Sequence, residues 1–263
     1  MVFPVGDDNS DRRSFPYVSI TLIVINVLVF AVLQQGFRPE GVDEGFTLAW
    51  CQVPAEILTG RDVVTEPEVR AIRTPAGIEQ VTVPGLQPTP VPVWLTLLTA
   101  IFMHGSVMHL LGNMWFLWIF GDNVEDDMGH VRYLLFYLAT GVLASLAFVA
   151  FNASGEAALT PCLGASGAIS GVLGAYLVLH PQRRVSVLLL RLMVDVPGYV
   201  AVGIWFAFQV VSGLFDSSGG GGGVAYSAHV AGFLAGIALA KPMSYRGARA
   251  EAEPLVVLRR RLP

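Results

Sequence analysis

Two short segments of the chain carry residue types that can perform acyl-transfer chemistry. Ser166 lies in a run of small residues, Gly164-Ala165-Ser166-Gly167, and His229 begins a second run that extends to Gly236. A serine hydroxyl becomes a nucleophile when an adjacent histidine accepts its proton. Small residues beside the serine let a neighbouring backbone approach closely and leave the hydroxyl accessible. Each run alone also fits a packing face between helices, so only the combination indicates catalysis.

A third segment could supply hydrogen-bond donors. His109 and Asn113 are four residues apart and therefore lie on one face of a helix. Two fixed donors on one face suit an oxyanion hole, which stabilises negative charge as it develops on a carbonyl oxygen. The alternative is hydrogen bonding between helices that locks a bundle, and His104 is assigned to that structural role.

Other hydrolytic chemistries lack their residues. The chain has no His-Glu-x-x-His zinc motif, and its two cysteines cannot form a four-thiolate metal site. A catalytic pair of aspartates would have to lie within the apolar segments, but Asp195 and Asp216 fall at the ends of one. A Ser-Lys dyad would need a lysine near the serine, but the only lysine, Lys241, ends another segment. No basic stripe with interleaved aromatic residues suggests nucleic acid as a partner. Serine with histidine remains, and neither a metal nor a cofactor is implied.

The elements that must position these residues are membrane spans. Of the 263 residues, 54% are apolar and 14% are charged, and the mean hydropathy is +0.60. Ordinary soluble domains are ~25% charged, so these values disfavour a soluble enzyme. Six apolar segments predict an all-α membrane protein, a six-transmembrane-helix bundle. They are Tyr17 to Gln35, Trp94 to Phe120, Val131 to Phe151, Leu163 to Leu179, Val196 to Phe215 and Val224 to Ala240.

Helix geometry places Ser166 and His229 at similar depths. Ser166 precedes His180, at the inner end of its segment, by ~21 Å of helix, and His229 precedes Lys241 by ~18 Å. The serine segment is also shorter than the ~30 Å hydrocarbon core. Its beginning is therefore expected below the outer surface, where a water-filled indentation could reach Ser166.

Basic residues set the predicted orientation. With the N-terminus inside, the inner segments hold twelve of the sixteen Lys and Arg residues, and the other four, Arg38, Arg61, Arg70 and Arg73, share one outer loop. Basic residues near span ends stay on the cytoplasmic side, so the bundle is predicted to be N-in/C-in. The chain then divides into a cytoplasmic N-terminal segment (1–16), a membrane domain (17–243) and a cytoplasmic tail (244–263).

Three segments allow alternatives. The outer loop 36–93 contains eight of the sixteen prolines and eight of the twenty acidic residues, so little continuous helix or sheet and little core are expected there. It is either a connector close to the membrane or a small substrate-recruiting domain. The stretch Val185 to Met193 is predicted to lie at the membrane interface rather than to span. The first segment follows Arg12-Arg13, and a retained anchor is favoured over a cleaved export signal because its apolar run is long.

Together these motifs resemble the rhomboid family of intramembrane serine proteases. The resemblance runs from about Trp94 to Pro242 and is carried by His-Gly-Ser-Val-Met-His-Leu-Leu-Gly-Asn (104–113), Gly-Ala-Ser-Gly (164–167) and Ala-His-Val-Ala-Gly-Phe-Leu-Ala-Gly (228–236). It implies that Ser166 is the nucleophile and His229 the general base. It also implies an oxyanion hole of His109, Asn113 and the Ser166 backbone amide. Gly164 would shape the approach of the substrate, with Gly167 and Gly232 as packing positions.

Two positions depart from the family pattern. Some members place a tyrosine four residues after the serine, where it stacks on the histidine, and Ser170 stands there in this chain. Others have Trp-Arg in the first outer loop, whereas Cys51 follows Trp50 here. The glycine-rich run 219–223 matches the flexible cap that the family places over its site, although a plain linker has the same composition.

The resemblance implies an intramembrane serine endopeptidase of transmembrane protein substrates. A multi-pass protein of a bacterial-type plasma (inner) membrane is expected, and the oligomeric state stays open. The alternatives are a non-catalytic rhomboid-like protein that binds membrane clients and, less favoured, a small transporter, which lacks an intramembrane acid or arginine to mark an ion path. A disulfide between Cys51 and Cys162, both predicted to lie outside, is a further hypothesis.

Overall fold

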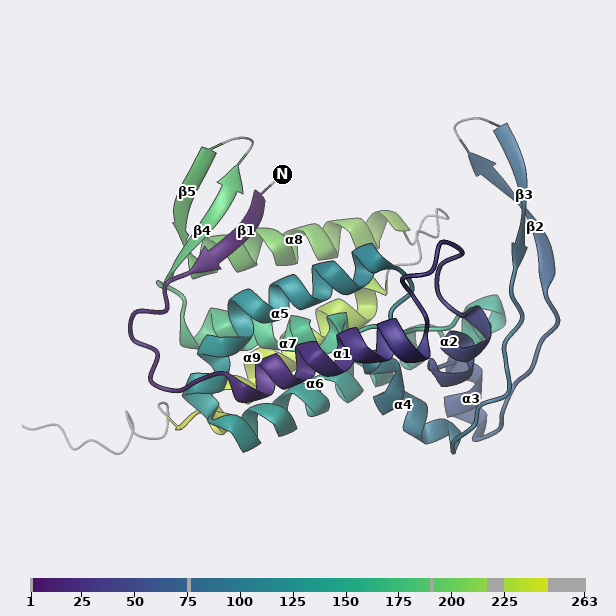
Figure 1. Cartoon of the computed structure of the whole chain (residues 1–263), viewed down its shortest axis with the longest axis horizontal. Helices are drawn as coiled ribbons and strands as arrows, with labels where there is room; N and C mark the ends of the chain where they lie inside the picture. The colour runs from purple at the N-terminus through teal and green to yellow at the C-terminus, as the bar shows by residue number, and fades with distance from the viewer. Residues whose placement is uncertain (1, 75–76, 190–191, 217–224, 246–263) are drawn as a thin grey trace, which may run out of the picture.

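Six helices of 12 or more residues form a bundle (Figure 1) in the computed structural model, which describes residues 2–74, 77–189, 192–216 and 225–245. These helices are α1 (Tyr17–Leu28), α5 (Val107–Met128), α6 (His130–Phe151), α7 (Ser166–Leu179), α8 (Gly198–Asp216) and α9 (Tyr226–Met243). The N-terminal strand and the end of α9 lie at one end of the bundle, and the segment between α1 and α5 lies at the other (Figure 1). Large buried side chains of α5, α6 and α7, such as Phe120, Tyr137 and Leu173, form the core.

The predicted segments match these helices to within a few residues at most boundaries. The first helix continues as a π-helix (Val29–Leu33). The second segment is broken, because three short turns, η2 (Val93–Leu95), α4 (Thr96–Thr99) and η3 (Ala100–Phe102), precede α5 and meet it at a bend of 79°. The Ser106 side chain caps α5 by accepting a hydrogen bond from the His109 backbone N–H at 3.1 Å. The segment predicted as Trp94 to Phe120 is therefore two helical parts rather than one continuous helix.

Judged by length and hydropathy alone, few of the described helices could cross a membrane. α6 is long and apolar enough to cross a membrane, and the bent pair Val93–Phe102 and Val107–Met128 qualifies if it counts as one span. The apolar helices Tyr17–Leu33, Ser166–Leu179 and Gly198–Gly213 are shorter. The number of six spans therefore stays a prediction.

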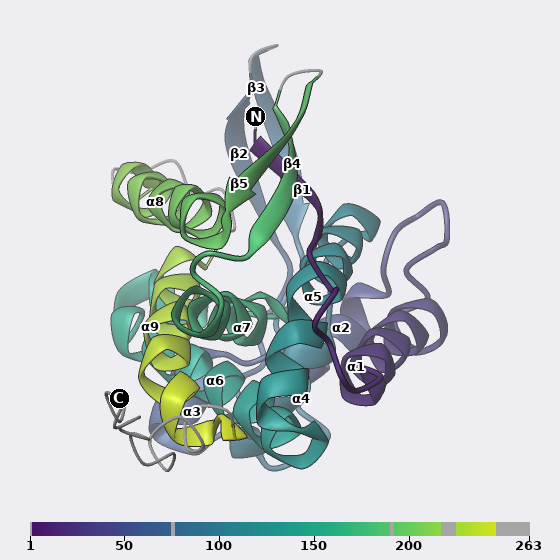
Figure 2. The same cartoon turned by 90° about the vertical axis from the view of Figure 1, so that its left-hand side faces the viewer.

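The fold is mostly helical, as predicted, but two small antiparallel sheets accompany the helices (Figure 2). The first has the order β1-β4-β5, formed by β1 (Val2–Asp7), β4 (Arg184–Leu189) and β5 (Leu192–Pro197). The stretch predicted at the membrane interface is thus a β-hairpin. Val185 and Val187 are buried and alternate with the partly exposed Ser186, which is the period of a strand with one covered face.

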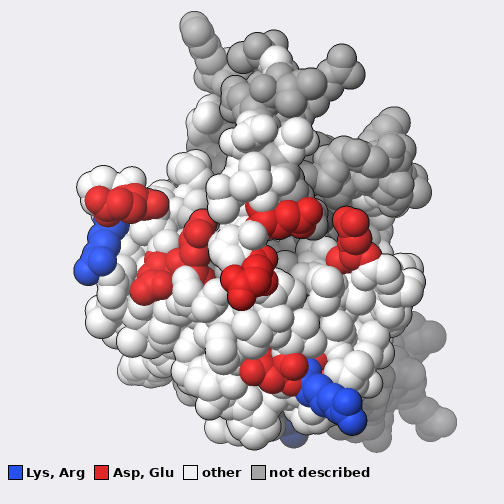
Figure 3. Space-filling model, turned by 90° about the vertical axis from the view of Figure 1, so that its right-hand side faces the viewer, with Lys and Arg blue, Asp and Glu red and all other residues white. Residues whose placement is uncertain are grey.

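The outer loop is more ordered than its composition predicts. It contains α2 (Glu44–Trp50), α3 (Pro54–Thr59) and a hairpin of β2 (Glu68–Thr74) and β3 (Gly77–Val83). A small cluster of Cys51, Val53 and Leu86 forms a core of its own. Acidic side chains are spread over this end of the molecule (Figure 3). A short 3-10 turn, η4 (Gly155–Leu159), follows α6, contacts α3 and leads to the segment before α7.

Glycines bring α7 and α9 into close contact. A Cβ atom at Gly232 would overlap the carbonyl oxygen of Gly167, and one at Gly236 would overlap that of Gly171. Backbone therefore packs directly on backbone between these two helices, as small-residue faces allow in membrane proteins. This contact fixes the height of His229, one turn before Gly232, relative to Ser166.

We expect Gly232→Ala to lower the stability of the folded protein, since overpacking a tight contact costs ~1–3 kcal/mol. The measurement is thermal unfolding of the purified protein in detergent. Gly203→Ala on α8 is the matched control, because a Cβ there would meet no atom within 4 Å. Equal melting temperatures for the two variants would contradict a close α7–α9 contact.

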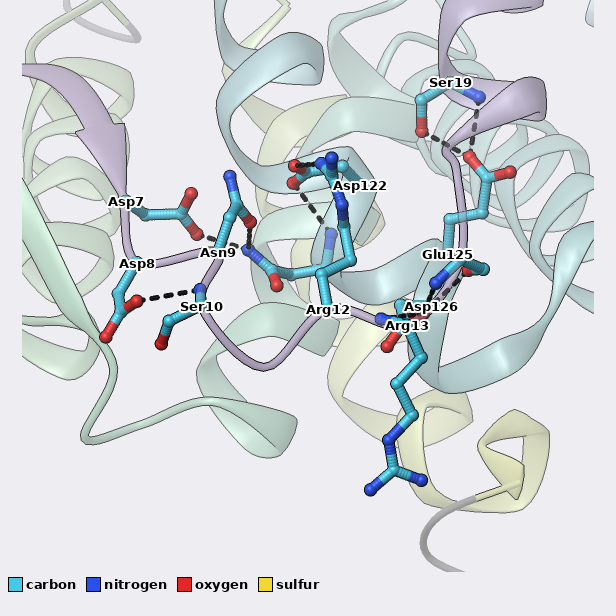
Figure 4. Close-up of polar contacts among 12 residues, drawn as sticks. Asp7, Asp8, Asn9, Ser10, Arg12, Arg13, Ser19, Asp122, Glu125 and Asp126 are labelled. Carbon is cyan, nitrogen blue, oxygen red and sulfur yellow. Dashed lines mark hydrogen bonds and ion pairs between the residues drawn. The ribbon is translucent and has the colours of Figure 1, made fainter.

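A polar network attaches the N-terminal segment to the bundle (Figure 4). Arg12 pairs with Asp122 at 2.6 Å, and Glu125 accepts hydrogen bonds from the backbone N–H groups of Val18 and Ser19 at 2.9 and 2.8 Å. At the end of β1, one carboxylate oxygen of Asp7 accepts from Asn123 at 2.7 Å and from the Tyr176 hydroxyl at 2.8 Å. The first residues of the chain are thereby held against α5 and α7.

Asp7 should make this attachment dependent on pH. Burial raises the pKa of the Asp7 carboxyl from 3.8 to about 6, against the opposing effects of Tyr176, Asn123 and Arg183; Asp122 adds to the increase. The folded state then holds the Asp7 proton more tightly than the unfolded state, so this contribution to stability is present at low pH and is lost as the pH rises through about 6.

We therefore expect hydrogen exchange in β1, corrected for intrinsic rates, to become faster as the pH rises through that range. Asp7→Asn keeps an oxygen that can accept both hydrogen bonds and should remove this part of the dependence. An identical pH dependence in the wild type and the variant would exclude Asp7 as its origin.

Candidate active site

Ser166 and His229 meet across the interface between α7 and α9. The His229 Nε2 atom lies 2.7 Å from the Ser166 Oγ atom, although 63 positions separate the two residues in the sequence. Ser166 is the first residue of α7, and His229 is in the first turn of α9. Both side chains are half-buried. The structure thus brings together the two residues that the sequence singled out as nucleophile and base.

The chain enters α7 through a constrained turn. Gly164 has a φ of +121°, a conformation that L side chains rarely adopt, and its N–H donates to the Ala100 carbonyl oxygen at 2.8 Å. The helix begins two residues later, at Ser166. Backbone N–H groups in the first turn of a helix have no partner within the helix. The Ser166 amide is accordingly one of the groups that could donate to an oxyanion.

His109 lies directly against this turn. A Cβ atom at position 164 would come within 2.8 and 2.9 Å of the His109 Cε1 and Nε2 atoms and 3.8 Å of the Ser166 Oγ atom. Glycine at 164 therefore makes room for the His109 ring next to Ser166. The Nδ1 atom of His109 accepts a long hydrogen bond, 3.4 Å, from the Gly105 N–H. This places the ring proton on Nε2, the nitrogen that faces Gly164.

Asn113 presents an unused donor on the same face of α5. Its side chain is 8% exposed, and its Nδ2 atom is buried without a hydrogen-bond partner among the described residues. Burying an amide N–H₂ group without a hydrogen bond costs free energy, unless a bound group accepts that hydrogen bond. An unpartnered N–H₂ group beside a serine and a histidine is what stabilisation of a developing oxyanion requires.

These side chains line one cavity of about 890 Å³. His109 and Asn113 come from α5, Ser166 from α7 and His229 from α9, while Gln209 and Trp205 of α8 form a further wall. Segments at the ends of helices, including Ser106, Asn152 and Thr160, line it as well. The cavity therefore lies toward the end of the bundle where α5, α7 and α9 begin.

His104 lies outside this cavity. Its ring is fully buried and packs edge-on against that of His109, with 5.1 Å between the centroids. The Gln34 side chain holds its backbone, accepting from the His104 N–H at 3.0 Å and donating to its carbonyl oxygen at 2.9 Å. This arrangement fits the structural role expected for His104, which is to support the His109 ring from behind.

Gln209 is the site residue whose function the sequence did not indicate. It is a polar residue within the apolar segment Val196 to Phe215, and no sequence motif connects it to His229. In the structure, its Oε1 atom lies 2.8 Å from the His229 Nδ1 atom. Ser170, at the position where some relatives have tyrosine, donates instead to the Ser166 carbonyl oxygen at 2.6 Å. The ring that contacts His229 edge-on is Tyr226, at 6.3 Å between centroids.

Both cysteines are free in the structure. Gln52 and Cys162 exchange two backbone hydrogen bonds, of 3.1 and 2.8 Å, which connect the outer loop to the segment before α7. Directly paired residues place their side chains on one face, and the next residue along the chain points to the other. Cys51 thus faces the Val53 and Leu86 cluster, while Cys162 faces the cavity. The structure shows no bond between the two thiols, contrary to the disulfide hypothesis.

We therefore expect mass spectrometry to find two alkylated cysteines in protein taken from an oxidising compartment. Burial raises the pKa of the Cys162 thiol to about 12 and that of Cys51 further, so both are unreactive thiols in the folded protein. Alkylation should be carried out after denaturation and without reductant. A peptide pair linked by a disulfide would overturn the arrangement of the outer loop.

Comparison with known proteins identifies the family. The family model for the Rhomboid domain matches residues 92–246, which include every side chain placed in the site above. The chain is 36% identical over 149 residues to "Rhomboid protease GluP" of Bacillus subtilis, covering 57% of this chain and 27% of that protein. It is 35% identical over 97 residues to "Presenilin-associated rhomboid-like protein A, mitochondrial" of Danio rerio, covering 36% and 25%. It is 30% identical over 147 residues to "Rhomboid protein 1, mitochondrial" of Saccharomyces cerevisiae, covering 54% and 40%.

The matched region is a larger share of this chain than of its relatives. The chain spans about a quarter of the length of the first two curated relatives, 27% and 25%. They include bacterial and mitochondrial proteins, so the similarity alone does not favour the bacterial inner membrane. Because the family model covers more than half of the chain, the chain belongs to the rhomboid family of integral membrane proteins.

Proposed function

We propose that this protein is an intramembrane serine endopeptidase that cleaves transmembrane segments of other proteins near their extracytoplasmic ends. The contact of 2.7 Å between Ser166 Oγ and His229 Nε2, inside a cavity of about 890 Å³, is the observation that carries the proposal. A serine hydroxyl that donates to a neutral imidazole is positioned to lose its proton as it attacks a carbonyl.

The reaction would proceed by acyl transfer. His229 takes the proton of the Ser166 hydroxyl while the oxygen attacks the scissile carbonyl carbon, and negative charge develops on the carbonyl oxygen. Asn113, His109 and the Ser166 amide donate to that oxygen. The tetrahedral intermediate collapses, His229 protonates the leaving amine, and an acyl-enzyme remains. A water molecule from the cavity, deprotonated by His229, then hydrolyses the ester.

The topology of the proposal is six spans with both termini in the cytoplasm. It is supported by six helices that run along the bundle, and by the N-terminal strand and the end of α9 lying at the same end (Figure 1). The cavity is at the other end, which becomes the extracytoplasmic side. A helical substrate must unwind there to expose its carbonyl, since its backbone groups are otherwise hydrogen-bonded within the bilayer. Helix-breaking residues near the cleavage site should therefore favour cleavage.

A direct test is incubation of the purified protein in liposomes with a generic single-span substrate, followed by mass spectrometry of the products. The expected result is cleavage near the extracytoplasmic end of the substrate helix by the wild type. Ser166→Ala is the control that must leave the substrate intact. Stable binding of the substrate by the wild type without any cleavage would favour the alternative function, a non-catalytic protein that holds membrane clients.

A further inference from the structure

The His229 ring is held by side chains from two other helices. On one side, Nε2 faces Ser166 of α7 at 2.7 Å, and on the other side Nδ1 faces the Oε1 atom of Gln209 on α8 at 2.8 Å. Gln209 is 8% exposed, so little water competes for its amide. We propose that Gln209 is a positioning residue that fixes the tautomer and the orientation of His229. This inference rests on the proposed function, in which His229 is the general base.

The amide oxygen determines which ring nitrogen carries the proton. A carbonyl oxygen can only accept, so the Nδ1 atom of His229 must be protonated to bond with it. The Nε2 atom then presents a lone pair to the Ser166 hydroxyl, which is the state a general base needs. If Gln209 donated its N–H₂ group instead, the proton would lie on Nε2, and the ring could not accept from Ser166.

The same bond persists after proton transfer. When His229 takes the Ser166 proton, both ring nitrogens carry protons, and the Gln209 oxygen still accepts from Nδ1. A carboxylate in this place would stabilise the imidazolium more strongly, but burying a second charge within the bilayer is expensive. The neutral amide provides the orientation of the acidic member of a serine protease triad without that cost.

Other contacts of His229 do not restrain the ring in this way. Tyr226 contacts it edge-on from the same helix, and Ser170 is engaged with the Ser166 carbonyl oxygen. The other titratable side chains lining the cavity, among the residues described, are His109 and Cys162. Neither forms a hydrogen bond to His229 in the structure. The hydrogen bond of Gln209 is accordingly the in-plane restraint on the Nδ1 side.

Aromatic packing directs Gln209 toward His229. Phe206 of α8 stacks on Phe233 of α9, with 4.2 Å between centroids and 18° between planes, and Trp205 packs on the same Phe233 at 6.1 Å. Phe233 is one turn beyond His229 on α9. These contacts fix the rotation of α8 against α9. Gln209, one turn after Trp205, is thereby turned into the cavity at the height of the imidazole.

The test compares Gln209→Leu, which removes the acceptor at similar volume, with Gln209→Glu, which keeps an oxygen in the same place. The first readout is the rate at which a fluorophosphonate labels Ser166. In this reaction the serine oxygen forms a bond to phosphorus, fluoride leaves, and His229 takes the hydroxyl proton. The second is the separation of kcat from KM with a single-span substrate. The third is the tautomer of His229, read from ¹⁵N imidazole spectra and assigned by comparison with His229→Ala.

We expect Gln209→Leu to lower labelling and kcat by ~10- to 100-fold with KM nearly unchanged, a part of the ~10²- to 10⁴-fold that a positioned base contributes. Its His229 spectrum should lose the pure Nδ1–H signature. Gln209→Glu should restore labelling toward the wild-type rate. Val211→Leu, at an exposed position of the same helix, is the matched control and should react as the wild type does.

Two results would overturn the inference. Labelling of Gln209→Leu at the wild-type rate, or an unchanged tautomer in that variant, would each show that Gln209 only connects α8 to α9. If the wild type itself neither labels nor cleaves, the proposed function fails instead. The tautomer measurement then decides by itself whether Gln209 sets the state of the His229 ring.

Discussion

Ser166→Ala and His229→Ala are each expected to abolish cleavage, with rates lower by ~10⁴-fold or more, because the hydroxyl and the imidazole act in one proton transfer. The 2.7 Å contact between them is the physical reason. Both side chains are half-buried in a cavity rather than packed in the core. Expression and thermal stability should therefore remain near those of the wild type.

The double variant sharpens this expectation. Residues that act as one unit have strongly non-additive effects, so Ser166→Ala/His229→Ala should be no slower than either single variant. The measurement is the rate of product formation by the three variants at equal protein and substrate concentrations in liposomes. Substantial cleavage by Ser166→Ala would remove the nucleophile assignment, and a double variant much slower than both singles would indicate two independent roles.

Asn113→Ala is expected to lower the cleavage rate by ~10²- to 10³-fold, the usual cost of losing one oxyanion-hole donor. The Nδ2 atom of Asn113 is buried without a partner, so its removal leaves no other side chain unpaired in the described structure. The affinity for substrate should change little, because the donor acts mainly in the transition state. Stability should be retained or slightly increased.

A matched control is available on α1. Asn26 is also a buried asparagine, and its side chain donates to the Leu22 carbonyl oxygen at 2.8 Å outside the cavity. Asn26→Ala should alter the melting temperature without a large change in turnover. An Asn113→Ala variant with wild-type turnover would mean that Asn113 only packs between helices.

The sequence singled out four residues that line one cavity because their signals are local. His109 and Asn113 share a helix face by their spacing, and the distances of Ser166 and His229 from the inner ends of their helices predicted similar depths. Gln209 stands out in the sequence only as a polar residue within an apolar segment. Its partner depends on the rotation of α8, which the packing of Phe206 and Trp205 on Phe233 sets. Such a contact between distant segments is not encoded in any one segment.

The sheets were missed for a related reason. An apolar stretch of nine residues, 185–193, fits a membrane-interface segment as well as a strand when its partner is unknown. The alternation of Val185 and Val187 with Ser186 was a strand signal, but it is short. The pairing of β1 with β4 joins Val2 to Leu189, and no pattern within either strand identifies the other.

In the outer loop, the prolines lie mostly outside β2 and β3 and so did not prevent the hairpin.

The pairing of Val2 with Leu189 also constrains the order in which parts of the protein can fold. The ribosome completes β1 first, but its hydrogen-bonding partner β4 is synthesised only after α1, α5, α6 and α7. The first residues of the chain must therefore wait, unpaired, until the serine helix has left the ribosome. Contacts so far apart in sequence form late, since the intervening chain must be ordered first. Closure of this sheet can thus occur only in a chain that already contains the nucleophile.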